Sequence, residues 1–212
     1  MIKAEKATLL YQDHKKLIHA CNDIELEVTE GEFLGILGPS GSGKSSLLYL
    51  LSGLKLPSSG KISFDGKDYT SLNDSERSFF RKNYFGFVFQ QPYLLGYLTA
   101  LENVLVNSDH TEEAIYLLEA LGLKNSMHDL PYQLSGGERQ RICIARALVH
   151  QPKVIFADEP TSFLDHQNGI EVVNLLCQHK GSSSLVMVTH DQTMLKKADR
   201  IVTMSDGKLL LA

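Results

Sequence analysis

The sequence predicts an α/β fold with a largely parallel β-sheet, and apolar runs with their flanking turns carry this prediction. The runs 33–37 and 154–157 are continuously apolar, as expected of strands buried on both faces of a sheet. The first run leads through a glycine-rich turn into a helical stretch that extends to about Gly53. Buried strand, turn and helix recur along the chain, which is typical of parallel α/β proteins.

The remaining elements follow from periodicity in chain order. Residues 2–11 and 17–28 alternate loosely between apolar and polar side chains, which indicates half-buried antiparallel strands. Amphipathic helices are predicted over about 111–122 and 138–150. No strong strand is predicted between 91 and 150, so this stretch is predicted to be an inserted helical subdomain. Further short strands are predicted at 61–64, 85–89, 185–188 and 201–204.

Composition excludes several classes of protein. A chain of 212 residues with 43% hydrophobic and 22% charged residues is neither disordered, collagen-like nor a disulfide scaffold. The net charge of −4 argues against nucleic acid as a partner. Cys21, Cys143 and Cys177 form no CxxC pair and are expected to be buried hydrophobes in a reducing cytosol. No secretory signal is seen, and the longest apolar stretch, 47–56, falls short of the ~20 residues that span a bilayer.

A phosphate-binding loop is predicted between the apolar run 33–37 and the helix after it. The segment 38–45, GPSGSGKS, fits the pattern GxxxxGK[ST] in the strand-to-helix context that confirms it. Its glycines let backbone N–H groups converge on phosphate oxygens at the positive end of the helix. Lys44 would neutralise charge on the β- and γ-phosphates, and the Ser45 hydroxyl would bind Mg2+. The candidate nucleotide-binding residues are Gly38, Pro39, Ser40, Gly41, Ser42, Gly43, Lys44, Ser45 and Ser46.

A pair of acidic residues supplies the second part of the site. Asp158 and Glu159 directly end the apolar run 154–157, which is the Walker B pattern. Asp158 would hold Mg2+, and Glu159 would orient or deprotonate the attacking water. Adjacent acids after a strand are weak evidence by themselves, but together with the phosphate-binding loop they predict triphosphate hydrolysis. Because no NKxD-like guanine-reading motif is present, ATP is predicted rather than GTP.

The segment 134–140, LSGGERQ, opens a helix about twenty residues before Asp158 and resembles the signature motif of the ABC (ATP-binding cassette) ATPases. Ser135, Gly136 and Gly137 would bind an anion at the start of this helix. Ser135 followed by Glu138 is also an ordinary capping box. Both interpretations are retained, because a capping box needs no paired glycines whereas a second clamp on the γ-phosphate does.

The resemblance extends to four further positions. In this family the residue matching Gln90 reaches Mg2+ and the water, and the residue matching His190 contacts the γ-phosphate. The residue matching Asp165 lies in a loop that meets the opposite subunit. The residue matching Tyr11 stacks on adenine, a contact of about 1–3 kcal/mol by analogy with base–aromatic stacking. Each residue type also has a plain structural interpretation, and only the shared order and spacing favour the functional one.

The resemblance covers essentially the whole chain and therefore implies its fold. It implies a P-loop NTPase (RecA-like) core with an N-terminal antiparallel β subdomain and an inserted helical subdomain. The expected organisation is one nucleotide-binding domain over 1–212, with the core at 1–90 and 151–212 and the helical subdomain at 91–150. Departures from the family pattern are few: Ser46 replaces a frequent threonine, Phe163 a frequent small residue, and the segment between Gln90 and Ser135 is short.

The resemblance also implies partners. A homodimer, or a pair with another ABC ATPase, would hold each ATP between the Lys44 loop of one chain and residues 135–137 of the other. The expected membrane partner is a separate permease, with this chain cytoplasmic and peripheral on the inner face of the cell membrane. The strings 86–92 and 98–104 are similar to the lipoprotein-releasing and macrolide-efflux branch. A non-transport membrane complex, such as one for mechanotransmission or cell-wall hydrolase regulation, remains an alternative, and the cargo is open.

Overall fold

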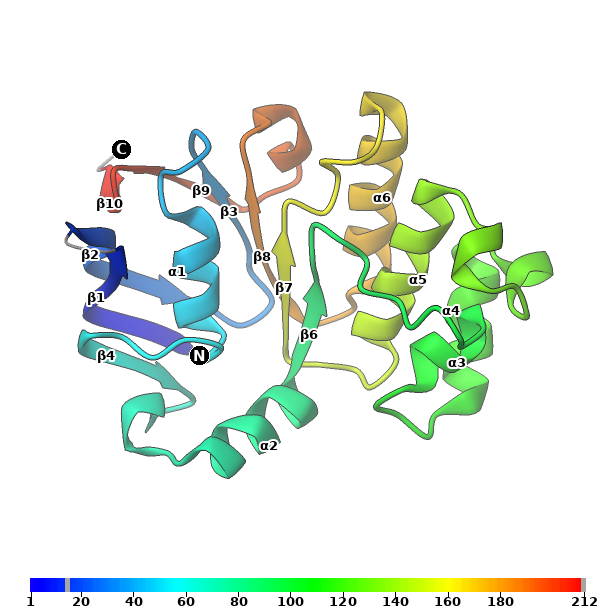
Figure 1. Cartoon of the computed structure of the whole chain (residues 1–212), viewed down its shortest axis with the longest axis horizontal. Coiled ribbons are helices and arrows are strands. Elements are labelled where there is room, and N and C mark those ends of the chain that lie inside the picture. Colours follow the sequence, from blue (N-terminus) through cyan, green and yellow to red (C-terminus); the bar gives the residue numbers. More distant parts are fainter. Residues whose placement is uncertain (14–15, 211–212) are drawn as a thin grey trace. The chain divides into compact units, whose positions relative to one another are not determined.

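The computed structural model describes residues 1–13 and 16–210 and contains two compact units. Unit 1 comprises Met1–Arg81 with Ser184–Ala212, and unit 2 comprises Lys82–Ser183 (Figure 1). The described helices include none that is both long and apolar enough to cross a bilayer.

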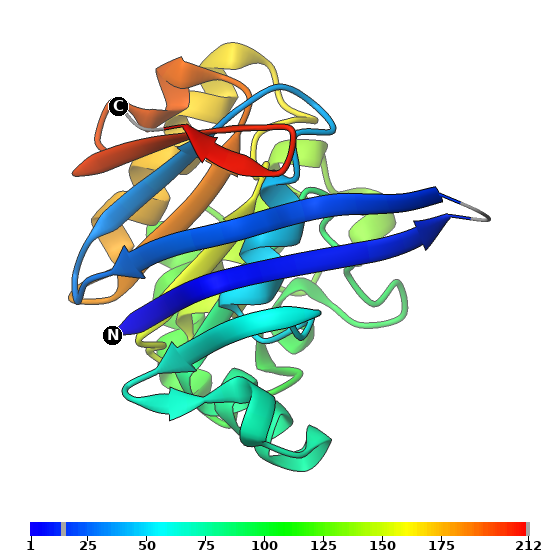
Figure 2. The ribbon, with the colours of Figure 1, turned by 90° about the vertical axis from the view of Figure 1, so that its left-hand side faces the viewer.

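An antiparallel sheet forms the first part of unit 1, with strand order β2-β1-β4-β5. Its long antiparallel pair joins β1 (Ile2–Asp13) and β2 (Lys16–Val28) (Figure 2). In this pair Ile2 lies opposite Val28. Strand β4 (Ser59–Phe64) pairs with the other edge of β1, and the short β5 (Lys67–Asp68) follows it. The alternating burial along β2 is what one apolar face and one solvated face produce. The predicted antiparallel strands are confirmed.

A mainly parallel arrangement forms the rest of unit 1. Strand β3 (Phe33–Leu37) lies between β8 (Ser184–Thr189) and β9 (Arg200–Ser205) and runs parallel to both. Strand β10 (Lys208–Leu210) closes the edge as an antiparallel partner of β9. All six residues of β8 are buried, as its apolar run predicts. Helix α1 (Lys44–Leu51) packs on β8 and on the β1–β2 pair through its leucines.

Unit 2 has a parallel strand pair and four α-helices. Strands β6 (Phe85–Val88) and β7 (Val154–Asp158) pair in register from Phe85 opposite Val154 to Val88 opposite Ala157. Helix α5 (Gly136–Leu148) is central, because α3 (Ala100–Leu105), α4 (Thr111–Ala120), α6 (His166–His179) and β6 all contact it. Residues 91–150 contain helices, including short 3-10 turns, and no strand. The division into a core and a helical subdomain stays a prediction.

Two helices outside the stretch 91–150 were not predicted from the sequence, and α3 was predicted only as part of that helical stretch. Helix α2 (Asp74–Tyr84) is strongly polar, and Phe80 is its one buried residue. That phenylalanine lies edge-on to the rings of Phe64 and Tyr69, at centroid distances of 6.1 and 6.5 Å. Helix α6 is capped by Asp165, whose carboxylate accepts a hydrogen bond from the backbone N–H of Asn168. Helix α2 has too few apolar residues to show a helical repeat in the sequence, so it is recognised only from its packing in the folded chain.

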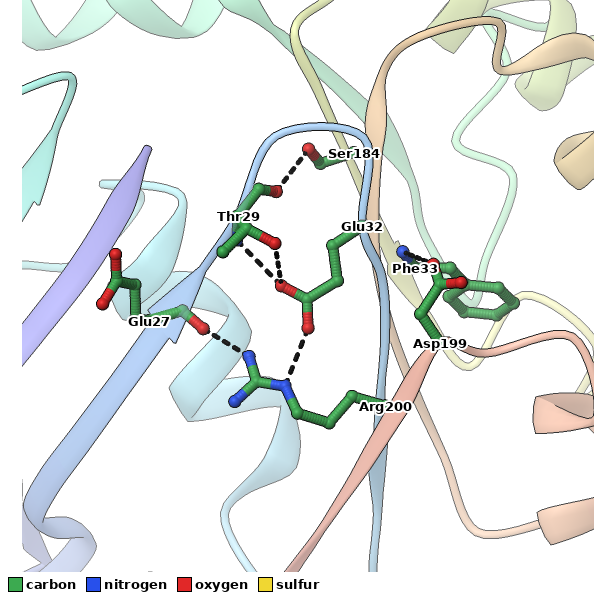
Figure 3. Close-up of polar contacts among 7 residues, drawn as sticks. All are labelled: Glu27, Thr29, Glu32, Phe33, Ser184, Asp199 and Arg200. Atoms are coloured by element: carbon green, nitrogen blue, oxygen red, sulfur yellow. Dashed lines mark hydrogen bonds and ion pairs between the residues drawn. The ribbon is translucent and has the colours of Figure 1, made fainter.

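A polar network joins the amino ends of the parallel strands in unit 1 (Figure 3). The Glu32 carboxylate accepts hydrogen bonds from the backbone N–H and the hydroxyl of Thr29, at 2.8 and 2.9 Å. Its other oxygen accepts from Arg200 Nε at 2.8 Å, and Arg200 also donates to the backbone carbonyl of Glu27. The Glu32 side chain is only 8% exposed. The network therefore ties the end of β2 to the starts of β3 and β9.

The Glu32 network should make stability depend on pH. Burial alone would raise the pKa of Glu32, but the hydrogen bonds from Arg200 and Thr29 outweigh it and lower that pKa. The carboxylate thus contributes stability above the pKa of about 4.3 in the unfolded chain, and this is lost as pH falls through the lower folded pKa. Glu32→Gln should cost about 1–3 kcal/mol at pH 7, because charged hydrogen bonds are lost.

Urea unfolding at a series of pH values measures this contribution. Wild type should lose stability between about pH 5 and pH 3, and the difference from Glu32→Gln should shrink over that range. The matched control is Glu5→Gln, since Glu5 forms an exposed pair with Lys3 at 2.8 Å and should contribute nothing measurable. Equal effects of the two substitutions would contradict the role given to the network.

Candidate active site

The predicted phosphate-binding loop lies in unit 1, between the end of β3 and the start of α1. Two of its glycines are required by close backbone contacts. A Cβ on Gly43 would lie 2.1 Å from the carbonyl oxygen of Ala20, and Gly43 has φ +100°, in the region that favours glycine. A Cβ on Gly38 would lie 2.3 Å from the carbonyl oxygen of Met204. The loop is therefore held against the β2 and β9 backbones.

The start of α1 is built to accept an anion. Its N-cap residue, Gly43, offers no side-chain oxygen to the first N–H groups, and the first turn contains no acidic residue. Lys44 is 5% exposed, and its Nζ donates to the carbonyl oxygen of Pro39 at 2.9 Å. A buried ammonium beside a helix N-terminus without a capping side chain is complementary to phosphate. The residues present thus fit the triphosphate of a nucleotide.

Parallel register brings the predicted γ-phosphate contact to the same edge of unit 1. Leu37 pairs with Thr189 in the β3–β8 ladder, so Gly38 and His190 follow directly on paired residues. His190 is exposed at this edge. Tyr11, in contrast, lies in the β1–β2 pair opposite Ile18 and is 37% exposed. Its ring is thus accessible, and stacking on adenine stays a prediction.

The other predicted residues lie in unit 2, where the same register rule applies. Val88 pairs with Ala157, so Gln90 and Asp158 follow at neighbouring carboxyl ends of β6 and β7. Asp158 is buried, at 6% exposed, whereas Gln90 is exposed. Parallel strands place such end groups at one edge of the sheet. The structure therefore places the predicted metal and water ligands of this unit at the same edge of the strand pair.

Glu159 has an unusual backbone conformation. Its φ is +43°, in the left-handed region that a residue with a side chain rarely adopts. Such a conformation costs about 1–3 kcal/mol and persists only where the surroundings enforce it, which is common at active sites. The turn after it is closed by a hydrogen bond from the Ser162 N–H to the Glu159 carbonyl at 3.2 Å. The strained residue is the one predicted to activate water.

The signature segment forms the N-terminus of α5, and its capping box is present. The Ser135 hydroxyl donates to Glu138 Oε2 at 2.6 Å, and the Glu138 N–H donates to that hydroxyl at 3.3 Å. Hydrogen bonds from the side chain and backbone of Ser135 hold the pKa of Glu138 below its usual value. A Cβ on Gly136 would meet nothing within 4 Å, and neither Gly136 nor Gly137 has a left-handed φ. Folding of the chain therefore does not require these glycines.

Asp165 and the segment before it lie beside the signature turn within unit 2. A Cβ on Gly137 would lie 4.0 Å from Leu164 Cδ2. Asp165 is exposed and caps α6, and a hydrogen bond from the Asn168 N–H lowers its pKa. This structural role accounts for Asp165 without a partner, and its contact with a second subunit stays a prediction.

Comparison with known proteins identifies the family. The family described as ABC transporter matches residues 21–162. The chain belongs to this family. It is an ATP-binding cassette with ATPase activity, and the predicted P-loop NTPase fold is confirmed.

Individual relatives are similar over most of the chain. It is 41% identical to the lipoprotein-releasing system ATP-binding protein LolD of Legionella pneumophila (strain Paris), covering 99% of this chain and 96% of that protein. It is 38% identical to the macrolide export ATP-binding/permease protein MacB of Chlorobaculum tepidum, covering 98% of this chain and 33% of that protein. The ATP-binding cassette MJ0796, in a dimeric post-hydrolysis structure bound to ADP and Pi, superposes with a TM-score of 0.91. That structure is 35% identical and is covered to 97%, with all of this chain aligned.

One set of side chains near the site was not singled out from the sequence. A cavity of about 530 Å3 in unit 2 is lined by Gln90, Gly136 and also by Arg139 and Gln140 of α5. Both residues lie in the first turns of the signature helix. The sequence could have predicted the position of Gln140, because this residue lies four residues after Gly136 and hence on the same helix face.

The close approach at Gly43 gives a stability prediction for the phosphate-binding loop. Gly43→Ala should cost about 2–4 kcal/mol, because the substitution adds a backbone clash to a strained φ. Gly41→Ala is the matched control, since Gly41 has φ +80° but open space around its Cα. It should cost only the backbone strain, about 1–2 kcal/mol. Urea unfolding of both variants measures the difference, and equal costs would contradict the contact with Ala20.

Proposed function

We propose that two copies of this chain close around ATP and that hydrolysis separates them, driving a separate integral membrane partner. The observation that carries this proposal is the open space at Gly136, followed by Gly137, where a Cβ would make only ordinary contacts at 3.8 and 4.0 Å. Folding of the chain does not require these two glycines. They would be required if another molecule came close to the backbone at the start of α5. The occupant with matching chemistry is the γ-phosphate of ATP held by the partner copy, because a helix N-terminus attracts an anion.

The relatives support this assembly. MJ0796 is dimeric in its structure with ADP and Pi. LolD is the ATP-binding protein of a lipoprotein-releasing system, and MacB combines ATP-binding and permease functions in one protein. The present chain aligns with nearly all of LolD and with a third of MacB. We therefore propose a permease as a separate subunit, with this chain peripheral to the membrane on its cytoplasmic face.

The residues of unit 1 would bind the nucleotide. Lys44 and the backbone N–H groups at the start of α1 would neutralise the β- and γ-phosphates, and Tyr11 would stack on the adenine. His190 would contact the γ-phosphate from the neighbouring strand end. These groups cover one side of the triphosphate. Residues 135–137 of the partner copy would cover the other side and exclude water, which strengthens every electrostatic contact inside the site.

The residues of unit 2 would carry the chemistry. Glu159 would take the proton of the attacking water as the bond to the γ-phosphorus forms, with ADP as the leaving group. Mg2+ would be held by oxygen atoms of Ser45, Asp158 and Gln90, and would neutralise charge that develops on the phosphate oxygens. Hydroxyl, carboxylate and amide oxygens are the donors that Mg2+ prefers. Phosphate oxygens of the nucleotide would complete the set of ligands, because Mg2+ is usually bound by one or two protein carboxylates together with substrate phosphates.

Removal of the proposed general base should trap the ATP-bound dimer. Glu159→Gln keeps the side-chain shape but cannot accept the proton, so turnover should fall at least ~100-fold while ATP affinity is unchanged. Size-exclusion chromatography with light scattering in Mg2+ and ATP should then show a stable dimer. Glu171→Gln is the matched control, since Glu171 is exposed on α6. Turnover near the wild-type rate in Glu159→Gln would contradict the role of Glu159.

The same trapped variant tests the membrane partner. Purified from membranes in ATP, Glu159→Gln should recover one integral membrane protein in a reproducible ratio, and Glu171→Gln should recover less of it. Recovery of the trapped dimer without any membrane protein would contradict the proposed permease.

Gly136→Ala tests whether the signature turn acts between copies. Since a Cβ here meets nothing within 4 Å, stability should change by less than about 0.5 kcal/mol, and ATP binding to the monomer should be unchanged. Turnover should fall about tenfold or more, because the methyl group would occupy the path of the partner's γ-phosphate. Gly96→Ala is the control, as Gly96 is equally open and lacks a left-handed φ. Normal turnover in Gly136→Ala would contradict the head-to-tail arrangement.

A further inference from the structure

The segment that carries Gln90 has no regular structure of its own. After β6 ends at Val88, residues 89–99 contain neither helix nor strand. A backbone without ladder partners needs other groups to satisfy its carbonyl oxygens and to fix its path. In residues 89–93, hereafter the Gln90 segment, side chains of α5 supply those groups.

Three side chains of α5 donate hydrogen bonds to the Gln90 segment. Gln140 Nε2 donates to the carbonyl oxygen of Phe89 at 3.3 Å. Cys143 Sγ and Arg146 Nη2 both donate to the carbonyl oxygen of Pro92, at 3.0 and 2.8 Å. Arg146 Nη1 donates to the next carbonyl, that of Tyr93, at 3.1 Å. Three side chains of α5 thus bind the carbonyl oxygens of Phe89, Pro92 and Tyr93.

The donors form a stripe because they are spaced three residues apart along α5. Gln140 is 3% exposed, and Cys143 is fully buried. Burial raises the pKa of Cys143 to about 11, so the sulfur stays protonated and can donate. Buried donors that each have an acceptor are costly to disrupt, since a lost bond leaves an unsatisfied group away from water. The stripe is therefore a strong constraint on the segment.

The backbone at Tyr93 shows that the constraint is effective. Its φ is +44°, a left-handed value that is unfavourable for a residue with a side chain. The Tyr93 ring meets the Phe89 ring edge-on, with centroids 5.8 Å apart, while Arg146 holds the Tyr93 carbonyl. A strained residue persists only when its surroundings determine its conformation, and these contacts do so. The Gln90 segment is thus held in one conformation that it would not adopt alone.

The same helix carries the signature turn. Ser135 caps α5, and Gly136 begins it, one helical turn before Gln140. Gln90 and Gly136 line the same cavity of about 530 Å3 within unit 2. Gln90 and Gly136 both have proposed roles at the nucleotide. Gly136 belongs to α5, and Gln90 is attached to α5 by the hydrogen bonds to its segment.

We propose that Gln140, Cys143 and Arg146 are positioning residues for ATP hydrolysis, fixing Gln90 relative to the signature turn so that both move as one body. This inference rests on the function proposed above. Gln90 would then reach the metal and water with its position set in advance, which lowers the entropic part of the barrier. None of the three side chains needs to touch the nucleotide.

Substitutions at Cys143 separate positioning from packing. Cys143→Ala removes the donor to Pro92, whereas Cys143→Ser keeps one. Cys143→Ala should lower kcat for ATP hydrolysis about tenfold and leave KM and ATP affinity within twofold, and Cys143→Ser should restore most of kcat. Arg146→Met should lower kcat in the same way. Arg146→Lys should restore only part of it, because an ammonium lacks the rigid planar fork with which Arg146 reaches the two carbonyl oxygens through separate nitrogens. Cys177→Ala on α6 is the matched control and should behave as wild type.

Hydrogen–deuterium exchange supplies a readout besides activity. In Cys143→Ala, amides of the Gln90 segment should exchange about tenfold faster, while those of α6 should not change. A segment that loosens while kcat stays within twofold of wild type would overturn the positioning role. So would a loss of kcat that follows the melting temperature and is not restored in Cys143→Ser. A wild-type chain without ATPase activity would overturn the proposed function itself, and the positioning role with it.

Discussion

The register of parallel strands is the constraint on which the site depends. Leu37 opposite Thr189 places the phosphate-binding loop and His190 at one edge of unit 1. Val88 opposite Ala157 does the same for Gln90 and Asp158 in unit 2. A slip of one residue would turn every side chain of a strand to the other face. Because both faces of these strands are closely packed, such a slip would break the packing on each of them. Burial of these runs therefore positions the chemistry at their ends.

The two helix starts are built differently, and the difference matches their proposed ligands. Helix α1 has a glycine N-cap, no acidic residue in its first turn and a buried lysine, so it can bind a strongly charged anion within the chain. Helix α5 has its first N–H groups partly satisfied by Ser135, with the Glu138 carboxylate beside them. That turn is stable without a ligand. An anion would thus find a permanent site at α1 and a complementary, weaker one at α5.

Most of the fold and of the candidate site could be predicted from the sequence, because the strongest signals in the sequence are local. Buried strands, the glycine loop and the capping box each depend on a few neighbouring residues, and all are present. Helix α2 escaped prediction because Phe80 alone marks its buried face. The left-handed conformations of Glu159 and Tyr93 also have no local signal in the sequence, and Tyr93 is held by Arg146, about fifty residues later. The donors of α5 were missed for the same reason, because their acceptors lie about fifty residues earlier.

The glycines divide the site into parts required for folding and parts available for assembly. Gly43 is fixed by a backbone contact inside the chain, so its loss would first affect the folded state. Gly136 meets nothing within reach, so folding places no demand on it. Glycine in the first turn of a helix is a poor choice for stability. Its presence beside a satisfied capping box is not explained by folding of the monomer, and the proposed contact with a triphosphate brought by a second copy would explain it.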